Sequence, residues 1–306
     1  MIRRILAVLA ALIAVGAVLA GCSGAVTTST RPQVVVTTNI LGDIVSHLAG
    51  EQADVTTLMK PDADPHSFEI SAQQAARLAE ADLLVSNGLG LEEGLQQHLD
   101  RAAEAGVRTF VAGDRIEVLP YADGEARGAP DPHFWTDPAR MRDVVDALEP
   151  ALAAIDGVDA AAIRANADAY RAQLVALDAE MTAAFAAIPV EKRALVTNHH
   201  VFGYLADRFG FRVVGAVIPG GTTLAAPSAA DLRDLVAAIE EAGVRTVFAE
   251  SSQPDRLVRV LAEEADLRVE VVELYTESLT PQGAGADSYL TMMRANTARI
   301  AQGLGA

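Results

Sequence analysis

Histidines are the residues of this sequence whose type and placement point to chemistry. The chain has six, and His66, His133 and His199 follow segments with strand-like patterns. Imidazole is the commonest metal ligand in proteins and suits zinc. His47 and His98 lie within helical patterns away from strand ends, so we expect them to be surface or packing residues. The single cysteine excludes a thiolate site, and a metal site must therefore combine imidazoles with carboxylates.

Two of the histidines end the same tripeptide in separate loops. These tripeptides are Asp64-Pro65-His66 and Asp131-Pro132-His133. Proline fixes its own φ and disfavours helix in the residue before it, so each histidine is presented from a stiff turn. The preceding aspartate can hydrogen-bond a backbone group or orient the imidazole. One such tripeptide is common in turns, whereas two of them indicate a shared site.

The other ligands are less well determined by residue chemistry. His199 and His200 both follow the predicted strand 194–197, and ligands in parallel α/β lobes bind beyond the carboxyl ends of strands. The pattern alone does not choose between these two histidines. A fourth ligand is equally open, because Glu250 follows the predicted strand 244–249 and Asp287 starts the last helix. A carboxylate at a helix start is often only a cap.

The elements that must position these residues alternate between strand and helix in both halves of the chain. The predicted strands are 34–38, 55–59, 83–86, 107–111, 194–197, 212–216, 244–249 and 269–272. The predicted helices are 40–49, 71–81, 91–105, 201–209, 229–242, 255–264 and 287–303. Strands that alternate with helices of this length imply parallel sheets covered on both faces. Because the order of elements repeats, we expect two similar α/β lobes.

One long helix is predicted between the lobes. Residues 160–187 contain no Gly or Pro, and Pro189 follows them. Apolar residues recur there at helical spacing: Ile163, Tyr170, Leu174, Leu177, Met181 and Phe185. At about 1.5 Å per residue the helix is roughly 40 Å long and can cross both lobes. We therefore expect an N-terminal lobe at 33–157, a rigid linking helix at 158–189 and a C-terminal lobe at 190–306.

The N-terminus predicts secretion and a lipid anchor. Arg3 and Arg4 precede an apolar run at 5–20, which is shorter than the roughly 20 residues that usually span a membrane. The run ends in Leu19-Ala20-Gly21-Cys22, which resembles the lipobox of bacterial lipoproteins. This predicts a signal peptide at 1–21 and a lipidated tether at 22–32. The folded part is then extracytoplasmic and held to the membrane through Cys22.

The charge of the chain argues against a nucleic-acid partner. Its formal net charge is −17, and its only two lysines are Lys60 and Lys192. Nucleic-acid binding requires a basic stripe or patch to neutralise phosphates, and the sequence contains none. An acidic surface attracts cations weakly, but such a field is not a site.

Several ordered motifs together resemble the zinc/manganese solute-binding family of ABC importers, which contains the ZnuA, TroA and PsaA-type lipoproteins. These motifs are Thr37-Thr38-Asn39, Asp64-Pro65-His66, Ala81-Asp82-Leu83, Asn87-Gly88, Asp131-Pro132-His133-Phe134-Trp135, Thr197-Asn198-His199, Ala249-Glu250-Ser251-Ser252, and Asp287-Ser288-Tyr289 followed by Met292-Met293. The resemblance covers nearly the whole mature chain. One departure is that 121–130, just before the second histidine, is short and lacks histidine, whereas zinc-type relatives often carry a long His-rich acidic loop there.

The resemblance implies a ligand set and a role. The implied metal ligands are His66, His133, His199 and Asp287. Glu250 becomes a residue near the ligands or in the cleft wall, and the role of His200 stays open. The implied function is capture of one divalent metal ion, zinc, by a monomer that delivers it to an ABC transporter permease. Manganese is the alternative cargo, although manganese-type relatives typically have glutamate where this chain has His199.

A secreted zinc hydrolase is the rival class of function. Catalytic zinc sites keep one coordination position open for water, whereas four protein ligands fill a tetrahedral ion. The common hydrolase helix motif His-Glu-x-x-His is also absent from the sequence. We therefore expect carriage of the metal and no enzymatic activity.

Overall fold

The computed structural model describes residues 31–122, 124, 126–218, 220–252, 258–259, 263 and 269–305. The predicted signal peptide at 1–21, Cys22 and all but the last two residues of the tether at 22–32 lie outside these residues, as does most of the predicted helix 255–264. Residues 31–306 form one compact unit. Among the described helices, none combines the length and the apolar character needed to cross a membrane.

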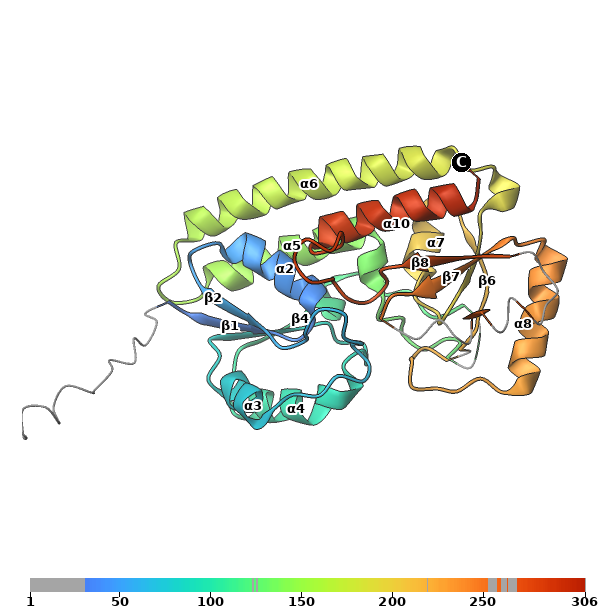
Figure 1. The fold of residues 1–306 in the computed structure, drawn as a ribbon. Coiled ribbons are helices and arrows are strands. Elements are labelled where there is room, and N and C mark those ends of the chain that lie inside the picture. Colours follow the sequence, from blue (N-terminus) through green and yellow to red (C-terminus); the bar gives the residue numbers. More distant parts are fainter. Residues whose placement is uncertain are drawn as a thin grey trace, which may run out of the picture. The chain divides into compact units, whose positions relative to one another are not determined.

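The first lobe is built on a four-stranded parallel sheet. Its strands are β1 (Gln33–Val36), β2 (Asp54–Thr57), β3 (Leu83–Ser86) and β4 (Thr109–Val111), in the order β2-β1-β3-β4. Its helices are α2 (Asn39–Ala49), α3 (Ala72–Ala79), α4 (Gln96–Glu104) and α5 (Pro138–Ala153), with short 3₁₀ turns η2 (Glu93–Leu95), η3 (Ala112–Arg115) and η4 (Phe134–Thr136). In Figure 1, α2 and α5 lie on one side of this sheet and α3 and α4 on the other.

Alternation along the strands explains this two-sided covering. Val34 and Val36 face the large core that includes α2 and α5, whereas Val35 faces a smaller core with residues of α3 and α4. Neighbouring side chains of a strand point to opposite faces of the sheet, so an unbroken apolar run such as 34–36 requires cover on both. The sequence pattern and the layers therefore agree.

The second lobe repeats the same strand order. Its strands are β5 (Ala194–Thr197), β6 (Arg212–Ala216), β7 (Thr246–Glu250) and β8 (Glu270–Leu274), in the order β6-β5-β7-β8, all parallel. Its helices are α7 (Gly203–Phe209), α8 (Ala229–Ala242) and α10 (Tyr289–Gly303), with the 3₁₀ turn η5 at Val190–Lys192. In both sheets the second strand in chain order, β2 or β6, lies at the edge, and the first strand, β1 or β5, lies next to it. The expectation of two similar α/β lobes is confirmed.

Helix α6 (Ala160–Ala186) is the predicted long helix, with 27 residues. Asp159 caps its start by accepting hydrogen bonds from the N–H groups of Ala161 and Ala162. Its buried residues include the six predicted ones and Ala167. The helix packs against α2 and α5 of the first lobe and against α10 of the second, and Figure 1 shows it running along both lobes. The predicted linking helix is therefore present.

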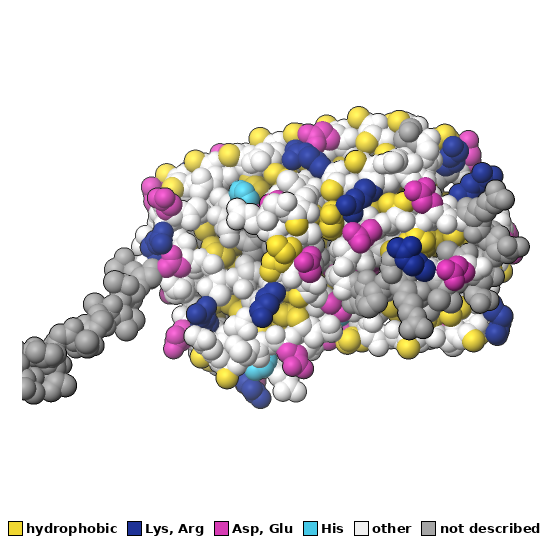
Figure 2. All heavy atoms as spheres, in the orientation of Figure 1, with side chains coloured by type: hydrophobic (Ala, Val, Ile, Leu, Met, Phe, Trp, Pro, Cys, Tyr) yellow, Lys and Arg dark blue, Asp and Glu magenta, His cyan; other side chains and the backbone are white. Residues whose placement is uncertain are grey.

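The surface carries mixed charge. On the face drawn in Figure 2, Lys and Arg side chains are scattered among Asp and Glu and form no broad basic patch. Three large apolar side chains of the described residues are exposed, Val175, Val190 and Leu224. They lie in different elements of the chain.

Candidate metal centre

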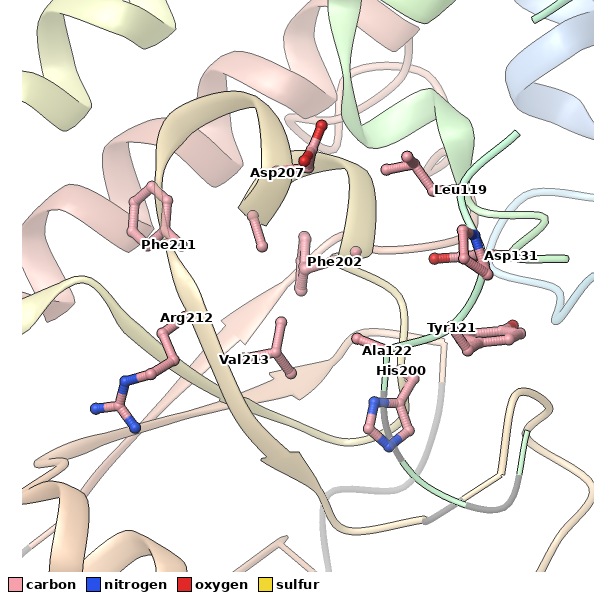
Figure 3. Close-up of a pocket in the computed structure, with 13 residues that line it drawn as sticks. Leu119, Tyr121, Ala122, Asp131, His200, Phe202, Asp207, Phe211, Arg212 and Val213 are labelled. Atoms are coloured by element: carbon pink, nitrogen blue, oxygen red, sulfur yellow. The ribbon is translucent and has the colours of Figure 1, made fainter. Parts of the chain in front are cut away.

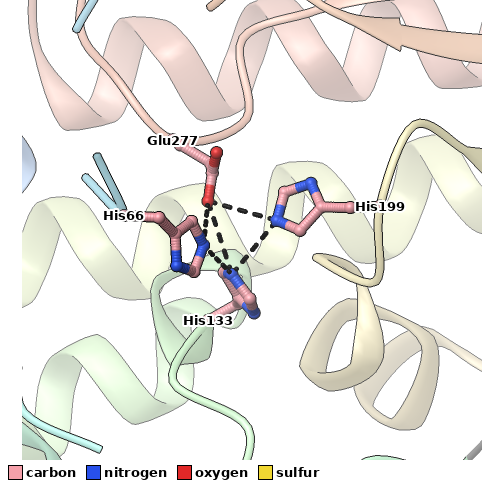
Figure 4. Close-up of side chains that lie close together, drawn as sticks. All are labelled: His66, His133, His199 and Glu277. Atoms are coloured by element: carbon pink, nitrogen blue, oxygen red, sulfur yellow. Dashed lines mark hydrogen bonds and ion pairs between the residues drawn. The ribbon is translucent and has the colours of Figure 1, made fainter. Parts of the chain in front are cut away.

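Four buried side chains meet in the structure, three imidazoles and one carboxylate (Figure 4). They belong to His66, His133, His199 and Glu277. Nε2 of His133 lies 3.4 Å from Nε2 of His66 and 3.3 Å from Nε2 of His199. Oε1 of Glu277 lies 3.1, 3.4 and 3.2 Å from Nε2 of His66, His133 and His199. One potential donor atom from each residue thus converges on one small volume.

The first lobe supplies two histidines from the predicted stiff turns. His66 lies in the loop after β2, and His133 directly precedes η4. In each turn the aspartate accepts a hydrogen bond from the backbone N–H of its histidine, Asp64 from His66 and Asp131 from His133, both at 2.9 Å. These aspartate turns orient the backbone before any ligand arrives.

The second lobe supplies its two groups from the carboxyl ends of neighbouring strands. His199 follows β5 by two residues, and Glu277 follows β8 by three. The carbonyl of His199 accepts a hydrogen bond of 2.6 Å from Thr197 Oγ1. The carbonyl of Thr276 accepts one of 2.7 Å from the indole Nε1 of Trp135, which lies in η4 of the other lobe. Both ligand loops of this lobe are therefore held by hydrogen bonds.

The outer nitrogens of two imidazoles contact carboxylates. His133 Nδ1 is 2.7 Å from Asp131 Oδ1, and His199 Nδ1 hydrogen-bonds Glu250. A carboxylate at Nδ1 fixes that nitrogen as the N–H donor and leaves Nε2 with its lone pair for a metal. In both rings Nε2 is the atom that faces the other histidines. Glu250 thus lies directly beside the ring of His199.

Charge inside the group shifts its pKa values. Burial alone would lower the pKa of His199, but the Glu250 and Glu277 carboxylates outweigh burial and hold it well above the usual 6.5. The pKa of His133 is also raised, because Asp131 and Glu277 outweigh its burial. Burial would raise the pKa of Glu277, yet the surrounding histidines hold it well below 4.5. A metal ion must displace protons from these imidazoles to bind.

The donor set fits one divalent cation. Both carboxylate oxygens of Glu277 are buried and have no hydrogen-bond partner among the described residues, although Oε1 lies near three imidazole nitrogens. Buried polar atoms are normally paired, and an unpaired carboxylate oxygen is costly. A cation bound by the three Nε2 atoms and Glu277 Oε1 would compensate the charge of this buried carboxylate and would have the ligand count of a tetrahedral zinc site.

Comparison with known proteins gives the family. The family model described as ZnuA, zinc-uptake complex component A, periplasmic, matches residues 34–303. The chain belongs to the ZnuA family. This confirms the resemblance seen in the sequence motifs, and it makes this chain a member of the metal-binding components of ABC importers.

Relatives of this ZnuA-family chain differ in the metal in their names. The chain is 28% identical over 278 residues to the iron-binding protein YfeA of Yersinia pestis, covering 91% of this chain and 88% of YfeA. It is 28% identical over 311 residues to the manganese ABC transporter substrate-binding lipoprotein PsaA of Streptococcus pneumoniae, covering 99% of each. The structure of the periplasmic zinc binding protein TroA from Treponema pallidum superposes with a TM-score of 0.82 at 27% identity, covering 90% of this chain and 100% of TroA.

The fourth member of the group corrects the sequence analysis, which expected Asp287. The side chain of Asp287 is exposed and points to local groups. Oδ2 accepts a hydrogen bond of 2.8 Å from Gly283 N, and Oδ1 accepts one of 3.3 Å from Thr291 Oγ1. Asp287 thus lies just before helix α10 and hydrogen-bonds a residue of its first turn. A local role of this kind at the start of a helix is the alternative to metal binding. It does not join the three histidines.

Glu277 was missed, although the sequence contained a signal for it. Thr276, Glu277 and Ser278 come shortly after the predicted strand 269–272, which corresponds to β8, at the edge of the sheet where His199 and Glu250 also lie. The rule that ligands gather beyond the carboxyl ends of parallel strands applies to all three strands of this edge. It was used for β5 and β7 but not for β8.

His200 points to a different place from His199. It lines a cavity of about 400 Å³ together with Tyr121, Asp131, Phe202 and Arg212, among others. Figure 3 shows its ring beside the loop that carries Tyr121, with apolar side chains across the cavity. The Tyr121 hydroxyl is 3.3 Å from Nδ1 of His133 and donates a hydrogen bond of 2.9 Å to the carbonyl of Gly221. The cavity therefore lies next to the group of four, and His200 is not part of that group.

Proposed function

We propose that this member of the ZnuA family captures one divalent metal ion, with zinc as its cargo, and delivers it to the permease of an ABC importer. The proposed ligands are His66, His133, His199 and Glu277. The observation that supports the proposal is the buried convergence of three Nε2 atoms on a carboxylate without other partners among the described residues. Two ligands come from each lobe, so a bound ion connects the lobes.

The donor set supports zinc as the proposed cargo. Imidazole nitrogens suit zinc, whereas manganese prefers carboxylate-rich sites and ranks lowest in intrinsic affinity for such ligands. The test is elemental analysis of the purified protein, followed by competition titration of the metal-free protein with zinc and manganese. We expect one zinc per chain, bound more tightly than manganese, and a shift toward manganese in His199→Glu.

Manganese is the alternative cargo because PsaA and other relatives carry that metal in their names. Equal or tighter manganese binding by the unmutated protein would overturn the zinc assignment while leaving transport intact. A hydrolytic role is disfavoured, since His66, His133 and Glu277 are each no more than 2% exposed and His199 is fully buried. Such a group offers no open position at which a substrate and a water molecule could meet.

The proposed location is the outer side of the cell membrane or the periplasm, with the chain anchored as a monomer through lipidated Cys22. Support comes from the lipobox-like sequence at 19–22 and from relatives named as lipoproteins. We expect Cys22→Ser to move the protein from the membrane fraction to the soluble fraction. Cell fractionation with immunodetection measures this. A mutant that stays with the membrane would contradict the anchor.

A further inference from the structure

Each imidazole of the metal centre has a second nitrogen that points away from the other ligands (Figure 4). His133 and His199 place this nitrogen against Asp131 and Glu250. In His66 the same atom, Nδ1, is buried and has no hydrogen-bond partner among the described residues. The orientation and tautomer of a metal-binding imidazole depend on the partner of its second nitrogen. The arrangement at His66 is therefore incomplete.

The aspartate of the His66 turn does not fill this role, although it precedes its histidine just as Asp131 does. Asp131 Oδ1 contacts both the backbone N–H and the ring Nδ1 of its histidine. Asp64 Oδ1 accepts a hydrogen bond from the backbone N–H of His66, but no hydrogen bond joins Asp64 to the ring Nδ1. Its Oδ2 accepts hydrogen bonds of 2.9 Å from Ser67 Oγ and 2.7 Å from Thr223 Oγ1. The two similar tripeptides thus differ in one respect: Nδ1 of His133 has a carboxylate partner, and Nδ1 of His66 has none among the described residues.

The structure places another carboxylate beside His66. Oε1 of Glu93 lies 3.8 Å from Nδ1, and the side chain of Glu93 is 45% exposed. Among the described residues, none donates a hydrogen bond to this carboxylate, so it can rotate without breaking one. Closing by about 1 Å would bring it to the 2.7–3.0 Å of a charge-assisted hydrogen bond. We propose that Glu93 is the positioning residue of His66. Its carboxylate accepts a hydrogen bond from the Nδ1–H group of His66 when Nε2 binds the metal.

The turn that carries Glu93 is anchored by its neighbour. Glu92 is 3% exposed, and its carboxylate accepts three hydrogen bonds from strand ends of the same lobe. They come from Thr37 Oγ1 at 2.6 Å, Asn87 N at 2.7 Å and Gly88 N at 3.1 Å. A buried carboxylate with three donors has little freedom to move. Glu92 therefore fixes the backbone from which Glu93 reaches toward His66.

Close packing keeps this turn beside the His66 loop. A Cβ atom at Gly94 would lie 2.8 Å from the carbonyl oxygen of Phe68, two residues after His66. Only glycine lets η2 approach the loop this closely. The anchoring of Glu92 and the contact at Gly94 together hold Glu93 within reach of Nδ1.

The test compares Glu93→Ala with Glu69→Ala, and it rests on the proposed function because it needs metal binding. Glu69 is also exposed and lies in the same lobe, so its variant controls for the lost charge. We expect Glu93→Ala to weaken zinc binding about 10-fold, the lower end of the 10–100-fold range for partners of metal-binding histidines. Glu69→Ala should bind zinc as the unmutated protein does. Glu93→Gln, which keeps an acceptor oxygen, should lose less than Glu93→Ala.

Two readouts separate positioning from a general structural role. The metal-free Glu93→Ala protein should melt at the same temperature as the unmutated protein, since the Glu93 side chain is 45% exposed and accepts no hydrogen bond from any described residue. In the zinc-bound protein, ¹⁵N-resolved NMR should show the Nδ1–H signal of His66 shifting in Glu93→Ala, with the signals of His133 and His199 unchanged. Unaltered zinc affinity and an unaltered His66 signal would overturn the inference. Failure of the unmutated protein to bind zinc would instead refute the proposed function, and this inference with it.

Discussion

Glu277 carries the negative charge among the four proposed ligands, and Asp287 is its natural control. Both are acidic residues of the segment between β8 and α10, but only Glu277 faces the imidazoles. We expect Glu277→Gln to weaken zinc binding by more than roughly 100-fold, because loss of a partner outside the ligand shell already costs 10–100-fold. Asp287→Asn should bind zinc like the unmutated protein. Isothermal titration calorimetry measures both, and a large loss in Asp287→Asn would restore the ligand set implied by the family resemblance.

Two of the histidines could be predicted from their own sequence pattern and the carboxylate could not, for a physical reason. Histidine is rare in this chain, so His66 and His133 stand out because each ends an Asp-Pro-His turn, whereas the pattern left His199 and His200 open. Carboxylates number 41, and most serve solubility, helix caps or ion pairs. Glu277 and Asp287 both lie between β8 and α10, so the local sequence does not show which of them is the better candidate for a metal ligand. Only the packing of the loop after β8, where Trp135 holds the Thr276 carbonyl, turns Glu277 inward.

At the scale of elements, α6 supports both lobes through one buried stripe. Leu177 on this stripe is fully buried, whereas Val175 on the opposite side of the same helix is 51% exposed. We expect Leu177→Ala to lower the free energy of unfolding by about 2–5 kcal/mol, the range for buried leucines. Val175→Ala should change it by less than about 0.5 kcal/mol.

Urea unfolding followed by far-UV circular dichroism and by the fluorescence of Trp135, the single tryptophan, measures this difference. Trp135 lies in the first lobe, so its signal and the overall helix signal should change together if α6 couples the lobes. Two separated transitions in the unmutated protein would show that the lobes unfold independently and that α6 does not couple them.

Elements were predicted where periodicity was strong and missed where it was interrupted. The six residues predicted to be buried in α6 are buried in the structure, because a 27-residue helix repeats its apolar pattern many times. Helix α5 (Pro138–Ala153) was not predicted, because Pro150 lies inside it and disfavours helix. Its start was nevertheless readable, since Asp137 caps the helix and Pro138 occupies its first position. Packing against α6 stabilises a helix that local propensity alone would not favour.

At the scale of the whole molecule, the lobes are joined by hydrogen bonds beside the metal centre. Asn39, at the start of α2, donates a bond of 2.8 Å to Ser278 Oγ and accepts one of 2.9 Å from Leu279 N. Thr223 of the second lobe donates one of 2.7 Å to Asp64. These bonds hold the loops of Glu277 and His66 from the opposite lobe. A metal ion that binds both loops therefore stabilises the arrangement in which these contacts are made.

Zinc should raise the melting temperature by an amount that grows with pH. In the metal-free protein the raised pKa values of His133 and His199 contribute stability that is present below pH 6.5 and is lost as pH rises through the raised values. The lowered pKa of Glu277 contributes stability above pH 4.5 that is lost as pH falls through its lowered value.

Zinc replaces the imidazole protons, so its stabilisation of the protein is smallest at acid pH and increases as pH rises well above 6.5. At 100 times the dissociation constant it amounts to about 2.7 kcal/mol, or roughly 5–10 °C for a protein of this size. Differential scanning calorimetry between about pH 5 and pH 8.5 tests this range of imidazole titration, with Glu277→Gln as the control expected to show little zinc effect. An equal shift at every pH would mean that the bound ion does not compete with the protons on these histidines.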